Sequence, residues 1–149
     1  MLELIKLSVY PKKELICVIN CGLKALCTQV NIANDKAYRL QLATEEIFIY
    51  AVHTVQKATI HSMITARFSY DSCGFQIVIE YTGKPGPLDR HLKNGSLHNI
   101  KVKSFEALGL CLASNILDSL TTQYWANHGI TCYTLSLNFA KQKKACLDW

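Results

Sequence analysis

The chain has 149 residues, half of them hydrophobic and 18% charged, with a formal net charge of +5. This length suits one domain, since a chain of about 150 residues buries roughly 70% of its unfolded surface, and the composition excludes a disordered protein. The N-terminus is too polar for a secretory signal, and no apolar run approaches the roughly 18 residues of a membrane span. We therefore expect a soluble, cytoplasmic protein.

The first half of the chain predicts a strand, two helices and then two further strands. Residues 2–9 alternate as a strand, and Pro11 ends it. Apolar residues then recur at helical spacing from Lys12 to about Val30, and a second helix is expected from Asn34 to about Ala58. Two strands follow, at residues 62–70 and 75–81, joined by a turn-type sequence.

The second half begins with a segment of no clear period, residues 82–104, which holds two of the three prolines. Such a segment inside a compact domain is typical of a functional loop or lid. A third helix is expected over Phe105–Leu120, and a closing hairpin of two strands surrounds Asn127–Gly129. We expect residues 1–140 to form a single domain and residues 141–149 to form a basic C-terminal tail.

The order of elements indicates the fold class. Strands cluster in hairpins, and helices do not alternate singly with them. This pattern predicts an α+β two-layer sandwich: a mostly antiparallel mixed sheet with helices on one face.

Seven cysteines are spread along the chain. Their odd number argues against a disulfide framework. The remaining alternatives are metal ligation and buried thiols. Because no CxxC pair occurs, and Cys17 and Cys21 lie in apolar, helix-spaced sequence, we expect core thiols and no metal site.

Three segments, taken in order, carry a resemblance to a known family. The second expected helix contains the pair Glu45–Glu46, a Gly/Pro loop follows the strand that ends at Tyr81, and Gly109 lies near the start of the third helix. Together they resemble the GHKL (Bergerat, histidine-kinase-like) ATPase fold, and within it the anti-sigma factor serine kinases of bacterial partner-switching systems. The likeness covers about residues 3–139.

The resemblance assigns roles to individual positions. Glu46 falls on the general base that accepts a proton from the partner's serine, and Tyr50 falls on the asparagine that holds Mg²⁺. Tyr81 replaces the aspartate that reads adenine, and Leu88–Asp89 echo a Phe-Asp pair in the loop. The nucleotide-contacting positions as a set are Tyr50, Tyr81, Gly83, Ala107, Gly109 and Leu110.

Three of these positions depart from the family pattern. A phenol at Tyr50 is a poor and bulky substitute for an amide ligand of Mg²⁺. Without the carboxylate at position 81, adenine loses a charge-assisted hydrogen bond, which is worth about 1.5–3 kcal/mol. Ala107 adds a Cβ where the family's phosphate loop has glycine. We expect weak or lost ATP and Mg²⁺ binding, with Tyr50 and Tyr81 packed where Mg-ATP would sit.

These observations are consistent with several functions. The first is an anti-sigma-factor-like regulatory protein that acts by protein–protein binding, with a sigma factor or an anti-sigma antagonist as partner, and with homodimerisation as a further option implied by the resemblance. The alternative is an active serine-protein kinase that uses Glu46. A nucleic-acid binder is the third, and the scattered basic residues disfavour it. The glutamates could also be plain exposed carboxylates, the histidines ordinary surface groups, and the basic loop 84–103 a phosphate-gripping lid.

Overall fold

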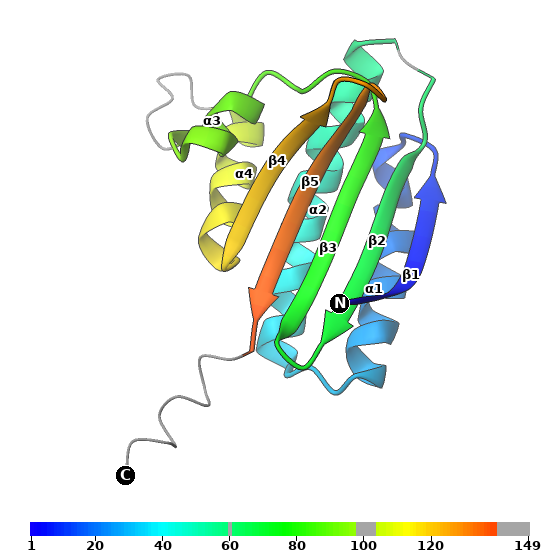
Figure 1. Cartoon of the computed structure of the whole chain (residues 1–149), viewed down its shortest axis with the longest axis vertical. Helices are drawn as coiled ribbons and strands as arrows, with labels where there is room; N and C mark the ends of the chain where they lie inside the picture. Colours follow the sequence, from blue (N-terminus) through cyan, green and yellow to red (C-terminus); the bar gives the residue numbers. More distant parts are fainter. Residues whose placement is uncertain (60, 98–103, 140–149) are drawn as a thin grey trace.

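The structure is a computed structural model that describes residues 1–59, 61–97 and 104–139. It is an α+β two-layer sandwich in which helices cover one face of a five-stranded sheet (Figure 1). The strands are β1 (Leu2–Val9), β2 (Ile64–Asp71), β3 (Gly74–Thr82), β4 (Ser119–Trp125) and β5 (Ile130–Asn138). The helices are η1 (Lys13–Leu15), α1 (Ile16–Gln29), α2 (Asn34–Lys57), α3 (Asp89–Asn94) and α4 (Phe105–Ile116).

The sheet has the strand order β1-β2-β3-β5-β4. Every pairing between described strands is antiparallel, so the expectation of a mixed sheet is wrong. The reason lies in the connections, because two tight hairpins and a return of β5 beside β3 bring no pair of neighbours into parallel alignment. Within the described ranges, no helix is both long and apolar enough to cross a bilayer.

Two element boundaries differ from the sequence-based expectation. The segment 82–104 contains a short helix, α3, which ends at Gly95 in a left-handed conformation (φ 67°) that glycine adopts without strain. Helix α4 ends at Ile116 and not at Leu120, because Leu117 is already extended (φ −97°, ψ 158°) and β4 begins at Ser119. The expected basic tail, residues 141–149, lies outside the described residues.

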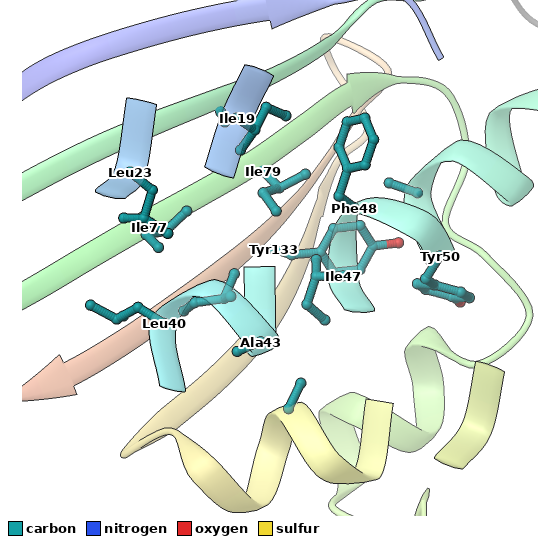
Figure 2. Packing of buried hydrophobic residues seen from close by; sticks show 14 of the residues in the cluster. Ile19, Leu23, Leu40, Ala43, Ile47, Phe48, Tyr50, Ile77, Ile79 and Tyr133 are labelled. Atoms are coloured by element: carbon teal, nitrogen blue, oxygen red, sulfur yellow. The ribbon is translucent and has the colours of Figure 1, made fainter. Parts of the chain in front are cut away.

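The core lies between the sheet and the helices. Helix α2 presents Leu40, Ala43 and Ile47 to the sheet, and β3 contributes Ile77 and Ile79 to the same core. All five residues are fully buried (Figure 2). Complete burial of each large aliphatic side chain contributes about 1.5–3 kcal/mol. This packing fixes the face of α2 that meets the sheet, and it thereby fixes where Glu46 and Tyr50 lie.

The other face of the sheet is only half-buried. Along β3, the half-buried residues Gln76, Val78 and Glu80 alternate with the buried ones. The Arg67 guanidinium lies 2.7 Å from Glu80 on this face and 3.5 Å from Glu3. No helix of the described chain covers these residues, as Figure 1 shows.

The cysteines correct one expectation. Only Cys27 is buried among the described thiols, and burial raises its pKa to about 11. Cys17 and Cys21 lie on the exposed side of α1, because the buried positions of that helix are Ile19, Leu23 and Leu26. Among the described residues, no group of three or more His, Cys, Asp or Glu side chains is arranged to hold a metal ion.

Candidate functional site

Five elements bring polar side chains together at one end of the core. We call this set the tyrosine–aspartate cluster, and its members are Tyr50, Tyr81, Asp89, Thr122 and Tyr133. Strands β4 and β5 place Thr122 directly opposite Tyr133, so both side chains point to the helix side of the sheet. Tyr50 comes from α2, Tyr81 from β3, and Asp89 is the first residue of α3.

Asp89 is the centre of the cluster. Its carboxylate is 5% exposed and accepts hydrogen bonds from three hydroxyls: Tyr50 at 2.6 Å, Tyr133 at 3.0 Å and Thr122 at 3.0 Å. A buried carboxylate is costly unless it is hydrogen-bonded. The three donors come from α2, β5 and β4, so a single acid fastens α3 to three other elements.

The hydroxyl of Tyr50 already makes a hydrogen bond as donor and another as acceptor. It donates to Asp89, and it accepts from the backbone N–H of Leu88 at 2.9 Å. Burial and the neighbouring Asp89 carboxylate raise the pKa of Tyr50, so its phenol stays protonated and acts as a donor. The ring itself is 1% exposed and meets the Tyr133 ring edge to face at 5.8 Å (Figure 2).

Burial has different consequences for the acid and the phenols of the cluster. It raises the pKa of Asp89, and the hydrogen bonds from Tyr50, Tyr133 and Thr122 oppose that rise in part. It also raises the pKa of Tyr133, where the Asp89 charge acts in the same direction. The phenols therefore stay protonated and donate hydrogen bonds, whereas the carboxylate is the group whose charge is desolvated by burial.

Tyr81 closes the cluster on the β3 side. Its hydroxyl donates to the carbonyl oxygen of Lys84 at 2.9 Å and lies 3.4 Å from the hydroxyl of Tyr133. The ring is 2% exposed. At the position where the resemblance places an adenine-reading acid, this chain thus has a buried phenol that holds the loop's own backbone.

The loop after β3 is shaped to pass close to these rings. Gly83 has a φ of 150°; its N–H donates to the carbonyl of Gly129, and its carbonyl accepts from Thr131 Oγ1, both at 2.7 Å. At Gly86, a Cβ would collide with the hydroxyl of Tyr50 and lie 2.7 Å from Cζ of the same ring. Glycine is needed at position 86 because the backbone touches a buried aromatic side chain.

Glu46 lies one turn before Tyr50 on α2 and is half-buried. A Cβ at Gly109 would collide with its carboxylate, and would lie 2.8 Å from its carboxyl carbon. The absence of a side chain on Gly109 therefore makes room for Glu46 between α2 and α4. Burial, and then the neighbouring Glu45 charge, raise the pKa of Glu46.

The remaining nucleotide positions of the resemblance lie in the first turns of α4. Ser104 caps the helix: its hydroxyl accepts from the N–H of Ala107 at 3.1 Å and its carbonyl from Leu108 at 3.1 Å. Leu110 is 1% exposed and belongs to the core. The amides at positions 107 and 108 are thus already bonded within the helix and its cap.

His53 has a partner that sequence reasoning missed. Its Nδ1 lies 2.6 Å from Glu106 Oε1, which links α2 to the first turn of α4. The two residues are far apart in sequence, so no local pattern could reveal the pair. The link helps to set the separation of the two helices that flank Glu46.

The central residues of the cluster were only partly visible from sequence. Tyr50 and Tyr81 stood out because they replace polar positions of a known pattern, and Asp89 echoed a pair in the same pattern. Tyr133 and Thr122 gave no such signal, since each occupies an ordinary alternating position of a strand. Only the pairing of β4 with β5 and the return of α3 bring them to Asp89.

Comparison with known proteins gives a likeness of fold. No family model and no curated protein matches the sequence. The fold is similar to a chain in the crystal structure of the SiaB–SiaC complex from Pseudomonas aeruginosa, with a TM-score of 0.65 and 12% sequence identity. The match covers 92% of this chain and 89% of that chain, so nearly the whole fold is shared.

Proposed function

We propose that this protein is a regulatory binding protein that acts by docking on a protein partner, and that it does not use Mg-ATP. The observation that carries the proposal is the tyrosine–aspartate cluster. Two of its rings, Tyr50 and Tyr81, stand at the positions where the resemblance places the metal ligand and the adenine reader, and both are held by hydrogen bonds within the chain.

The cluster is a poor host for a metal–nucleotide complex on three grounds. The Tyr50 oxygen already uses its donor and an acceptor site. Asp89 would present a negative charge to phosphate oxygens, and like charges at short range repel strongly inside a protein. Release of the rings would also break a set of buried hydrogen bonds, each worth about 0.5–1.5 kcal/mol or more where a charge takes part.

Two findings support a protein partner. The neighbour in structure comes from a complex of two proteins, SiaB and SiaC. The family that the sequence resembles works by partner switching, and its partners are a sigma factor and a small antagonist domain. Partner docking uses the outer surface, so it can persist when an internal nucleotide pocket has been filled. We therefore place this chain among partner-switching regulators that bind without phosphorylating.

A thermal-shift titration with Mg-ATP tests the proposal. A ligand present at 100 times its Kd stabilises the folded state by about 2.7 kcal/mol, which raises the melting temperature of a chain of this size by several degrees. We expect no shift at millimolar Mg-ATP. A shift of several degrees that Mg²⁺ or ATP alone does not reproduce would contradict the proposal.

The kinase alternative depends on Glu46, which is half-buried beside Gly109 and has a raised pKa. If the protein transfers labelled phosphate from ATP to a purified partner, and Glu46→Gln abolishes the transfer, the chain is a kinase. We expect no transfer in either protein. Partner affinity should be the same for wild type and Glu46→Gln, because that carboxylate is half-buried against Gly109 of α4 and the substitution keeps its size and shape.

A further inference from the structure

A groove lies next to the tyrosine–aspartate cluster, on its outer side. It has a volume of about 590 Å³ and runs between the loop after β3, helix α3 and strand β4. Its lining residues are Pro85, Gly86, Pro87, Asp89, Arg90, Lys93, Thr122, Gln123 and Tyr124. In Figure 1, α3 lies beside the upper part of β4, which is where these segments meet.

The charge of the groove is positive. Arg90 and Lys93 are both exposed, and neither has an acidic partner within the described residues. Asp89 also lines the groove, but its carboxylate is turned inward to three hydroxyls and forms no ion pair with either cation. Two exposed cations without an ion-pair partner outnumber the one buried acid, which favours an acidic ligand.

The strand beside the groove is an edge. Strand β4 is last in the sheet order, and within the described chain only β5 pairs with it. An edge strand offers unpaired N–H and C=O groups to another extended chain. Tyr124 is 39% exposed at the groove wall and adds an aromatic contact surface.

We propose that an extended acidic segment of the protein partner docks in this groove as an added strand on β4. Alternate side chains of an added strand point to the same face. One set of alternating acidic residues would then face Arg90 and Lys93, while the backbone bonds to β4. This inference rests on the proposed function, because it assigns the partner's chemistry and its place on the surface.

Fluorescence anisotropy with a defined probe tests the docking. The probe is a fluorescein-labelled octapeptide in which glutamate alternates with threonine and valine. We expect the full chain to bind it, and to bind a peptide with lysine in place of each glutamate about tenfold more weakly or worse. N-methylation of alternate peptide amides should weaken binding by about tenfold, because it removes donors needed for strand addition.

Two charge-matched variants locate the site. Arg90→Glu/Lys93→Glu should weaken probe binding by about tenfold or more, whereas Lys12→Glu/Lys13→Glu should leave it within about twofold. Lys12 and Lys13 are also exposed. Each double variant replaces two basic residues with two glutamates, so both change the net charge equally. Far-UV circular dichroism and the melting temperature check that each variant is folded.

Three results would overturn the docking proposal: no binding of the acidic probe, equal weakening by the two double variants, or equal binding of the N-methylated probe. None of them depends on nucleotide. A chain that binds the probe at Arg90 and Lys93 but is stabilised by Mg-ATP would keep the groove and refute the proposed function. If the protein binds neither the acidic probe nor Mg-ATP, the docking proposal is refuted and the proposed function is not.

Discussion

Two successive turns of α2 carry polar side chains in different surroundings. Tyr50 is 1% exposed, and its hydroxyl bonds to both Asp89 and Leu88. Glu46, one turn earlier, is half-buried against Gly109, and its carboxylate has no hydrogen-bonding partner within the described chain. The same helix therefore carries one polar group that is completely satisfied and one that is available.

The contrast separates a residue that stabilises the fold, Tyr50, from a residue that a nucleotide site would use, Glu46. Tyr50 joins α2 to α3 through its hydrogen bond to Asp89, and to β5 through its ring contact with Tyr133. Glu46 carries a carboxylate whose pKa is raised, first by burial and then by the neighbouring Glu45 charge. Substitution of a residue that stabilises the fold lowers the free energy of unfolding, whereas substitution of an unpartnered carboxylate changes it little.

The largest predicted effect breaks the joint at Tyr50. Tyr50→Ala should lower the free energy of unfolding by about 3–5 kcal/mol, since it removes a buried ring and leaves Asp89 without one of its donors. Glu46→Ala should change it by less than about 1 kcal/mol. Urea denaturation measures both. Equal losses for the two variants would show that the two turns contribute alike to stability.

A second prediction tests how closely the loop approaches the Tyr50 ring. Gly86→Ala should cost about 1–3 kcal/mol, because the new Cβ meets a buried aromatic side chain that cannot move aside. In a Tyr50→Ala background the cost should fall by about half or more, which a double-mutant cycle detects. An unchanged cost in that background would mean that the loop backbone, and not the ring, requires glycine.

The smallest predicted effect is a pH dependence that isolates Asp89. Because burial raises its pKa in the folded state, the folded chain binds this proton where the unfolded chain, with a pKa of about 3.9, does not. Wild type should therefore gain stability relative to Asp89→Asn as the pH falls from 7 toward 4, by about 1.4 kcal/mol for each unit of pKa difference. Glu46 is common to both proteins and cancels.

Urea unfolding of both proteins across that pH range gives the difference directly. A relative loss of stability on acidification would mean that the three hydroxyl donors outweigh burial and hold the pKa of Asp89 below its ordinary value. The tyrosine–aspartate cluster would then favour the ionised carboxylate, and burial would not be the dominant influence on Asp89.

Local patterns predicted much of the fold. The apolar spacing of α2 and the alternation of β2, β3 and β5 follow directly from burial on one face, and the structure has these elements close to the expected bounds. Helix α3 was missed because six residues give too short a period to recognise. The end of α4 was overestimated because Leu120 continues the helical spacing although it belongs to β4.

The candidate site was harder to predict, for a physical reason. Tyr50 and Tyr81 could be singled out one at a time, but their partner Asp89 is brought in by a loop and Tyr133 by a distant strand. A buried hydrogen-bond network is a property of tertiary packing, and only a resemblance that aligned Asp89 with a family position gave a hint of it. The pairing of His53 with Glu106 had no signal at all.

Crystals soaked with Mg²⁺ and a nonhydrolysable ATP analogue would decide whether the tyrosine–aspartate cluster can give way to a nucleotide. We predict that the Tyr50 and Tyr133 hydroxyls stay bonded to Asp89, with no ligand density between Glu46 and the loop after β3. Clear density for a bound triphosphate there, with the tyrosine rings rotated away and Asp89 released, would contradict a protein that works without Mg-ATP.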